Sequence, residues 1–562
     1  MQPGGSTASL LARRRLSTGG DATPRRMNHR RPVSPLLRGN ARSHFAVNVS
    51  SNFVYVTLTA IAMLMYIPFL VKHLGVAAIG LISLAQMLVL YAASVADGLN
   101  TAVNRYLAIE LNRGDDVAAN RTFNSALCVS GLLAVLLLLI GGIITYYFPS
   151  IFEVPHGLET QSRILFGCVA LHFVITIVDS NFAAPALIFH RFDLRNILRL
   201  LVMASRIGTV LLCFALLPAS LWQVGLGFVV SGVLSLAGSW WLWRGLAPGL
   251  SIAWREVNQT RAEELIHFGG WSVLNRVGVV LFVSTDLVII NWSFGPTVTG
   301  YYGVLFLFPE LIKNLMEAVT SILNPAIVGL YARSKIADLT KLTDRVLRVF
   351  AIGLALPIGL LCGLSGPLLA TWLGPQFEHL QILLIVMVFH LTINLATMPL
   401  SYVLTSYAKV RVQALVTLCL SAVNFCLALA IARWTDWGAV GVVSCGVAML
   451  TIRNLVFLSS YTAAVMGRPM WSFYAPLTGG GLATIAIGLC AYGLSHAWPT
   501  SGWVGLLAQG LIVALITAPL LYFYGLNRGD RLFLRRLLPL RIRQQLAAID
   551  LSNGLSPLGV AR

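Results

Sequence analysis

The sequence predicts an all-α integral membrane protein with about fourteen transmembrane helices. Its 562 residues are 57% hydrophobic and only 11% charged, whereas soluble domains carry about a quarter charged residues. Long apolar runs follow one another with short polar segments between them. Lysine and arginine are concentrated in alternate segments, which is the pattern of loops on one side of a membrane.

The apolar runs set the number of spans. A helix needs about 20 mainly apolar residues to cross a hydrocarbon core of roughly 30 Å. The predicted spans are 46–71, 76–97, 124–148, 164–188, 197–217, 221–243, 268–292, 300–323, 349–372, 382–406, 412–432, 437–466, 473–495 and 503–525. No segment between them is long enough to bury a core of its own, so we expect one polytopic unit.

Loop charges orient these spans. In the odd-numbered loops the basic residues are Lys72, Arg163 and Arg433, and the other loop and tail arginines and lysines lie in the even-numbered loops and both tails. Cytoplasmic loops collect basic residues, so we expect both termini in the cytoplasm. The first apolar run is long enough to span, so we expect no cleavable secretory signal.

The two tails are basic. Residues 1–42 combine arginines with Gly, Pro and Ser, which predicts a disordered tail. The other tail, 528–562, begins with a basic amphipathic pattern that predicts either a helix on the anionic inner leaflet or a solvated tail. The formal charge of +19 therefore comes from tails and short loops, which argues against a nucleic-acid partner.

An internal repeat divides the spans. A shift of 223 residues places His44 on His267, Asn52 on Asn275, and Gly80 on Gly303. This shift contains six predicted spans, an even number, so the two halves are parallel and related by a pseudo-two-fold axis along the membrane normal. We expect two six-helix lobes, 43–245 and 246–468, around a central cavity, with two extra helices in 469–527.

Ionisable residues inside spans are functional candidates because burying them in a membrane is costly. They are Asp179, Arg206, Arg276, Asp286, Glu310, Lys313, Glu317 and Arg453. Glu310, Lys313 and Glu317 are spaced i, i+3, i+7 and share one helical face, which we expect to face the cavity. The alternative is a self-neutralised structural cluster. Unpaired carboxylates, among them Asp179, Asp286, Glu310 and Glu317, are candidates for coupling to H⁺ or Na⁺.

Several short motifs resemble those of Wzx-like polysaccharide flippases of the MOP superfamily. They are Leu74-Gly75 with Gly80, Leu84-Ala85, Asp97-Gly98-Leu99-Asn100-Thr101-Ala102 with Arg105, then Phe294-Gly295-Pro296, Gly300-Tyr301-Tyr302-Gly303 and Asn324-Pro325. The resemblance implies two lobes in a V that alternates between inward-open and outward-open states. It also implies a bacterial inner-membrane location and a cargo of undecaprenyl-diphosphate-linked oligosaccharide, with a polysaccharide polymerase and a chain-length regulator as further partners.

A diphosphate cargo needs cations in the cavity. Arginine donates paired hydrogen bonds to phosphate and stays charged when it is desolvated, so Arg206, Arg276 and Arg453 are candidate ligands. Lys313, Asn52 and Asn275 complete the predicted substrate set. The alternative for each arginine is a buried partner of Asp179 or Asp286. The sequence departs from the family pattern of a cationic lumen, because four bases face four acids within the spans.

Two other functions fit a polytopic chain. A MATE-like cation or drug exporter has about twelve spans and cavity carboxylates, and the intramembrane arginines argue against it. A membrane-embedded polysaccharide polymerase needs a large polar outer loop, which the sequence lacks. We therefore expect a transporter without catalytic residues, cofactor or metal site.

Overall fold

The computed structural model describes residues 41–407 and 409–537, which form helices without any β-strand. The N-terminal lobe holds α1 (Ala41–Leu74), α2 (Val76–Arg113), α3 (Asp116–Ile151), α4 (Glu159–Ile188), α5 (Phe192–Leu216) and α6 (Leu221–Leu246). The C-terminal lobe holds α7 (Gln259–Leu305), α8 (Leu307–Ala332), α9 (Ile336–Gly363), α10 (Ser365–Trp372), α11 (Gln381–Phe389), α12 (Leu391–Ala396), α13 (Met398–Ser406), α14 (Val410–Trp434), α15 (Gly438–Thr451) and α16 (Ser459–Val465). They are followed by α17 (Tyr474–Ala497), α18 (Gly502–Leu520) and α19 (Arg528–Leu537). Most of the predicted tails, 1–40 and 538–562, lies outside the described residues.

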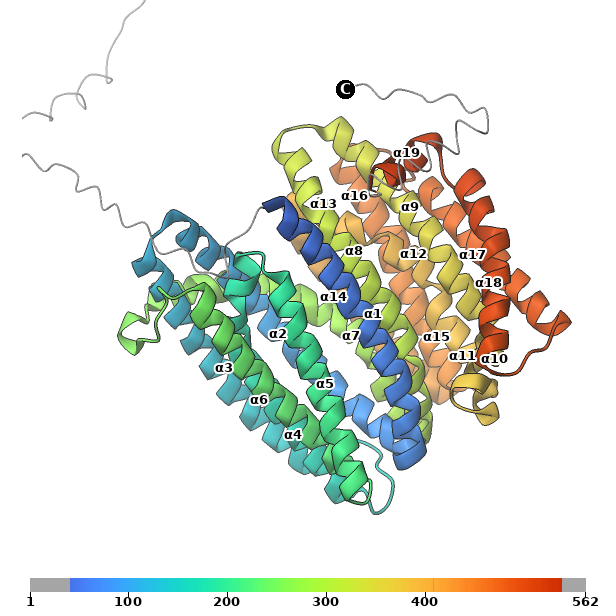
Figure 1. The fold of residues 1–562 in the computed structure, drawn as a ribbon, viewed down its shortest axis with the longest axis horizontal. Coiled ribbons are helices and arrows are strands. Elements are labelled where there is room, and N and C mark those ends of the chain that lie inside the picture. The colour runs from blue at the N-terminus through green and yellow to red at the C-terminus, as the bar shows by residue number, and fades with distance from the viewer. Residues whose placement is uncertain (1–40, 408, 538–562) are drawn as a thin grey trace, which may run out of the picture.

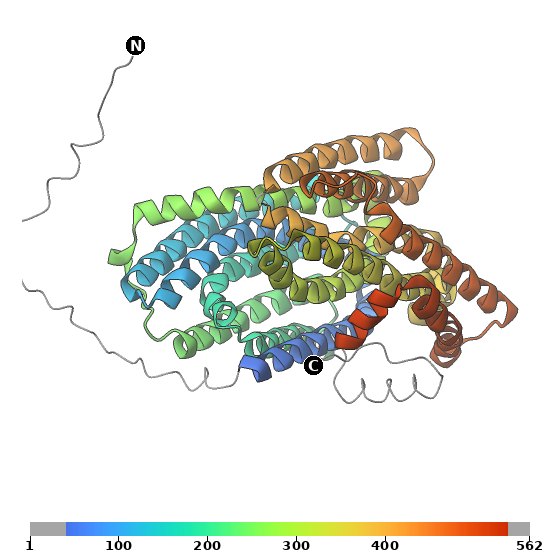
Figure 2. The same cartoon turned by 90° about the horizontal axis from the view of Figure 1, so that it is seen from above.

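The lobes lie side by side in both views (Figures 1 and 2). In Figure 1, α3 to α6 are on the left, most of the C-terminal lobe is on the right, and α1 crosses the region between them. The helices α17 and α18 form the right-hand edge, beside α9. The start of α1 and α19 are at the same end of the molecule.

Twelve helices in the described part are long and apolar enough to cross a membrane. One of them, Val277–Thr320, covers most of the predicted seventh span and most of the eighth, and a kink at Gly295 separates the two. Val76–Met87, at the predicted second span, is a shorter apolar helix. The all-α membrane fold is confirmed, and the count of fourteen stays a prediction.

Two predicted spans are interrupted helices. The span 382–406 consists of α11, α12 and α13, with Pro399 in the first turn of α13, where its missing N–H costs least. The span 437–466 consists of α15, a π-helical segment at Ile452–Leu458, and α16. Hydropathy detects the length of an apolar run, and it carries no information on such local changes of helical pitch.

Two glycines hold equivalent places in the two halves. Gly75 precedes α2 and Gly295 forms the kink of α7, and both have a φ of 80°. This left-handed region favours glycine because a side chain would clash there. The two positions differ by 220 residues, whereas the sequence comparison pairs residues that are 223 apart. The two halves therefore share this glycine at a slightly different offset from the predicted one.

The helices α2 and α7 cross at a second pair of glycines. A Cβ on Gly80 would lie 2.5 Å from the carbonyl oxygen of Pro296, and a Cβ on Gly300 would collide with the carbonyl oxygen of Val76. The contacts are reciprocal, as a two-fold relation requires, and again pair residues 220 apart. The predicted pairing of Gly80 with Gly303 at an offset of 223 is therefore wrong, because a comparison without gaps misses a three-residue length difference between the halves.

The extra helices pack closely on the C-terminal lobe. A Cβ on Gly480 of α17 would lie 2.5 Å from the Cβ of Ala351 in α9, and Gly363 of α9 meets the carbonyl oxygen of Gly488. Small residues let helix backbones approach in a membrane, where packing replaces the hydrophobic effect as the source of association. Thus α17 is part of the rigid C-terminal lobe.

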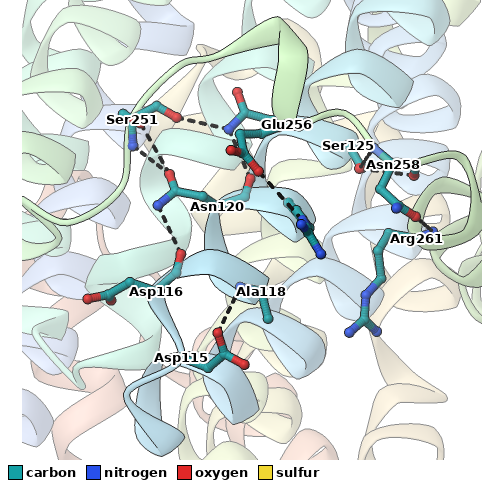
Figure 3. Close-up of polar contacts among 11 residues, drawn as sticks. Asp115, Asp116, Ala118, Asn120, Ser125, Ser251, Glu256, Asn258 and Arg261 are labelled. Atoms are coloured by element: carbon teal, nitrogen blue, oxygen red, sulfur yellow. Dashed lines mark hydrogen bonds and ion pairs between the residues drawn. The ribbon is translucent and has the colours of Figure 1, made fainter. Parts of the chain in front are cut away.

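The segment that joins the lobes is fastened to α3 (Figure 3). The side chain of Asn120 accepts a hydrogen bond from the Ser251 N–H (2.8 Å) and donates to the Gly249 carbonyl (3.0 Å). Asn124 makes the same two-way contact with Ala253 and Ser251. Further along, the Ser125 hydroxyl accepts a hydrogen bond from the Asn258 N–H. The connection therefore follows a fixed path before α7 begins.

The helix α19 docks on α9 through an ion-pair cluster. Asp530 is 3% exposed, and its carboxylate lies 2.7 Å from Nη1 of Arg348 and 3.4 Å from Nε of Arg345. The predicted amphipathic helix is thus present over Arg528–Leu537, with its acid turned toward the C-terminal lobe.

Candidate functional site

A cavity between the helices contains two adjoining chambers. We call the first, of about 410 Å³, the inner chamber; it is lined by α1, α2, α7 and α8, with His172, Arg206, Val224 and Phe228 from α4 to α6. The outer chamber, of about 720 Å³, is lined by α1, α2, α4, α5 and α6 together with Glu317 of α8. The residues common to both chambers are Tyr55, Thr59, Met63, His172 and Arg206. The inner chamber reaches Tyr302 and Gly303 near the glycine crossing, and the outer chamber reaches the α4–α5 turn.

One face of α5 supplies arginines to the outer chamber. Arg195, Arg199 and Arg206 line it, together with Leu198, Val202 and Met203. Their spacing of three or four residues places them all on one face of the helix. Sequence analysis predicted Arg206 but missed Arg195 and Arg199, because both lie at the start of the apolar run; their periodicity with Arg206 was the available signal.

Aromatic rings hold two of these arginines. The guanidinium carbon of Arg206 lies 5.0 Å from the centroid of Phe228, and that of Arg199 lies 5.6 Å from the centroid of Tyr55. A cation over a ring face is attracted by the ring's quadrupole. These contacts fix the side chains while leaving their N–H groups available to an anion.

The C-terminal lobe presents carboxylates to the same cavity. Glu310 lines the inner chamber and Glu317 lines the outer one. Lys313 lies 3.7 Å from Glu317, as expected for neighbours four apart on a helix. The structure thus brings Glu310 and Glu317 to the cavity and gives Glu317 a cationic partner on its own helix.

Short polar side chains form another part of the outer chamber's lining. Thr176, Asp179 and Ser180 come from α4, and Ser231, Ser235 and Ser239 from α6. Asn100, Thr101 and Asn104 of α2 extend it. Ser235 donates a hydrogen bond to Oδ2 of Asp179 (2.9 Å), and Ser180 donates to Asn100 (2.8 Å). We call these nine residues the polar wall.

Other predicted site residues lie elsewhere. Arg453, 9% exposed, is in the π-helical segment and donates hydrogen bonds to Thr417 (2.9 Å) and Asn454 (2.7 Å) inside the C-terminal lobe. It does not line the two chambers, so its predicted place in the cavity is corrected. Helical periodicity places a residue on a face of its helix and leaves open which neighbour covers that face.

Asp286 is also inside the C-terminal lobe. It is 6% exposed, and its Oδ1 has no hydrogen-bond partner in the described part of the chain. A Cβ on Gly446 would lie 2.6 Å from Oδ2, so α15 passes directly over the carboxylate. Asn52 lies on α1 and is not among the chamber residues. The side chains of Asn275 and Arg276 lie outside the described part of the structure.

The chain is similar to known membrane proteins. Residues 45–331, half of the chain, match the family described as "Polysaccharide biosynthesis protein". The chain belongs to this family. Its residues also match the "Uncharacterized membrane protein EpsK" of Bacillus subtilis, with 28% identity over 507 residues that cover 90% of this chain and 100% of EpsK.

Solved structures agree with the fold of this family member. The inward closed conformation of the lipid II flippase MurJ aligns with a TM-score of 0.62 and 11% identity, covering 84% of this chain and 98% of MurJ. An inward-facing multidrug resistance MATE transporter of the MOP superfamily aligns with a TM-score of 0.60 and 13% identity, covering 75% and 99%.

These findings confirm the resemblance predicted from the sequence. The protein is a multi-pass membrane protein of the polysaccharide biosynthesis family, and its helical fold is similar to those of the MATE and MurJ structures. The described residues contain no group of three or more His, Cys, Asp and Glu side chains arranged to bind a metal ion.

Proposed function

We propose that this protein moves undecaprenyl-diphosphate-linked oligosaccharide units across the bacterial inner membrane by alternating access, for surface polysaccharide biosynthesis. One observation carries the proposal: the arginine face of α5 lines a chamber that also holds the polar wall, which is uncharged apart from Asp179. Arginine forks bind diphosphate oxygens in pairs, and the hydroxyls and amides suit a glycan.

The lobes suggest how access alternates. The glycine crossing of α2 and α7 seals the inner chamber at one end, where Asn291 of α7 also exchanges hydrogen bonds with the Glu153 backbone (2.9 and 3.2 Å). We place this sealed end outside and both termini in the cytoplasm, because the loops of the other end carry the basic residues. Cargo then enters the outer chamber from the cytoplasm.

Carboxylates supply a means of coupling. Glu310 and Glu317 face the α5 arginines across the cavity, and Asp286 is buried in the C-terminal lobe. We propose that protons or sodium ions neutralise these groups during the cycle, since carboxylates are costly in a membrane. If transport keeps its full response to both ion gradients in Asp286→Asn, Asp286 is not the coupling group.

The geometry favours a transporter of anions over one of cations or an enzyme. A cation exporter would place its cargo beside Arg195, Arg199 and Arg206, against electrostatic repulsion. An enzyme would need catalytic groups in an outer loop, and the α3–α4 connection spans only 152–158. We expect the flipped unit to pass to a polymerase and a chain-length regulator.

Binding to the purified protein tests the proposal. We expect a fluorescent undecaprenyl-diphosphate-linked oligosaccharide to bind the wild type, and Arg206→Ala to weaken binding about tenfold or more, as expected for losing charge-assisted hydrogen bonds. Arg163→Ala is the control, because Arg163 is an exposed arginine beside Tyr146, away from the chambers. Binding of ethidium but not of the lipid would favour the cation exporter instead.

A further inference from the structure

The outer chamber has two chemically different sets of lining residues. The proposed function assigns a specific ligand group, the diphosphate, only to the arginines of α5. The α5 face is cationic, whereas the polar wall of α2, α4 and α6 carries hydroxyls, amides and the single carboxylate of Asp179. A diphosphate has no hydrogen-bond donor to offer a carboxylate. The polar wall therefore needs another ligand group, and that group must donate hydrogen bonds.

Asp179 is built into this wall with one oxygen unused. The residue is 8% exposed, and Ser235 donates to Oδ2 at 2.9 Å. Oδ1 is buried and accepts no well-aligned hydrogen bond in the described part of the chain, although the Ser239 hydroxyl and the Arg195 guanidinium are close enough to interact with the carboxylate. An ionised carboxylate accepts several hydrogen bonds and donates none, so an unfilled acceptor at this position favours a ligand with hydroxyl groups.

A second unfilled acceptor lies on the same wall. Oδ1 of Asn104 is buried without a hydrogen-bond partner in the described residues, and Asn104 lines the outer chamber with Asn100. Buried polar atoms are almost always paired in proteins. The polar wall thus contains two unpaired acceptors, Oδ1 of Asp179 and Oδ1 of Asn104. A ligand with several hydrogen-bond donors would satisfy both.

The hydroxyl row on α6 continues this surface. Ser231, Ser235 and Ser239 follow at i, i+4 and i+8, so they share one face of a membrane-spanning helix and turn it toward the chamber. The hydroxyl of Ser231 donates to the carbonyl of Phe228 (2.8 Å) and keeps its acceptor lone pairs. The row therefore places hydroxyls roughly 5–6 Å apart along the chamber, a spacing that suits hydroxyls on opposite sides of a sugar ring.

We propose that the polar wall binds the sugar next to the diphosphate, with Asp179 as the residue that selects it. This inference rests on the proposed function. The arginines of α5 hold the diphosphate on one side of the chamber while the sugar hydroxyls donate to Asp179 and Asn104 on the other. The chamber volume of about 720 Å³ is in the range of roughly 300–1,000 Å³ that buries a small ligand. The chamber therefore has room to bind the first sugar, and the rest of the glycan lies outside it.

The test compares probes with and without sugar on the full-length purified protein. The probes are undecaprenyl diphosphate alone and undecaprenyl diphosphate carrying one hexose, either glucose, galactose or N-acetylglucosamine. We expect at least one sugar-bearing probe to bind the wild type more tightly than the sugar-free lipid. In Asp179→Asn, which keeps the shape but replaces an acceptor by a donor, we expect about a tenfold loss for that probe and no change for the sugar-free lipid.

Two further variants separate specificity from structure. Ser239→Ala removes one hydroxyl from the polar wall and should lower the preference for the same sugar without changing sugar-free binding. Asp436→Asn is the matched control, because it makes the same substitution at an exposed aspartate between α14 and α15 that lines neither chamber, and it should leave the sugar preference intact. Thermal unfolding of each variant checks that the fold is retained.

The outcomes distinguish the two proposals. If Asp179→Asn weakens both kinds of probe equally, or changes neither, or alters only a dependence on sodium or protons, the sugar role of Asp179 is overturned. If Arg206→Ala still weakens sugar-free binding in that case, the flippase proposal stands alone. If no undecaprenyl diphosphate binds the wild type, both proposals are wrong.

Discussion

Arg206 stands at the junction of the two chambers, supported by the ring of Phe228 and facing Glu310 of the other lobe. A charge in the middle of an apolar run is visible in a sequence, and the prediction of Arg206 succeeded for that reason. Arg195 and Arg199 were missed because Arg195 lies just before the predicted span 197–217 and Arg199 is its third residue, so both were treated as residues of the adjoining loop although their spacing matches that of Arg206. Arg453 shows the opposite limit, since its partner Thr417 becomes a neighbour only in the fold.

The buried carboxyl of Glu110 predicts that the stability of the protein depends on pH. Glu110 is 6% exposed at the end of α2, 3.3 Å from Arg261, and burial raises the pKa of its carboxyl above the ordinary value. A carboxyl with a raised pKa holds its proton more readily in the folded state. The stability it contributes is therefore greatest at acidic pH and falls as the pH rises through the folded-state pKa.

Glu110→Gln should remove this part of the pH dependence, because glutamine has no proton to lose. We expect the fall in thermal unfolding temperature between mildly acidic and neutral pH to be smaller in Glu110→Gln than in the wild type. Glu263→Gln is the control for the substitution itself, because it makes the same change at an exposed glutamate near the start of α7. Equal pH slopes in Glu110→Gln and the wild type would contradict this role for burial.

At the scale of elements, the crossing of α2 and α7 joins the halves at their closest approach. A side chain on Gly300 would collide with the backbone of Val76, and backbone cannot move aside as a flexible side chain does. The glycines were visible in the sequence, but their pairing was predicted three residues out of register. Reciprocal contact between equivalent residues is a property of the assembled halves, which a comparison of sequences does not contain.

Gly300→Ala should destabilise the protein by about 1–3 kcal/mol, the usual cost of overpacking, and separate the lobes at the sealed end. Gly208→Ala in α5 is the matched control, because a Cβ there meets no atom within 4 Å. Thermal unfolding measures both. A Gly300→Ala protein as stable as the wild type would mean that α2 and α7 do not rely on this contact.

At the scale of the whole molecule, the sequence predicted the helical class, the two lobes and the extra helices, because apolar length and loop charge are strong signals. The polarity of the cavity was not predictable in the same way. Counting charges gave a balance of bases and acids, whereas in the structure the arginines of α5 outnumber Asp179 in the N-terminal lobe and the glutamates Glu310 and Glu317 come from α8 of the other lobe. An anionic cargo thus has a basic wall even though the charges are numerically balanced.

The membrane potential should assist export if a diphosphate crosses with its charge. Moving a negative charge out of a negative interior gains roughly 2.3 kcal/mol per charge per 100 mV. We expect an imposed potential, negative on the cargo side, to accelerate transport in vesicles, and an ionophore that collapses the potential to slow it. An unchanged rate after collapse would count against transport of a net charge.

The most direct measurement is lipid flipping by the reconstituted protein. Vesicles containing a fluorescent undecaprenyl-diphosphate-linked oligosaccharide are exposed to a quencher that cannot cross the membrane, so only lipid in the outer leaflet is quenched. With the wild-type protein we predict that quenching proceeds to nearly all of the probe, whereas Arg206→Ala vesicles behave like protein-free ones. Quenching limited to the outer leaflet in wild-type vesicles would contradict the account.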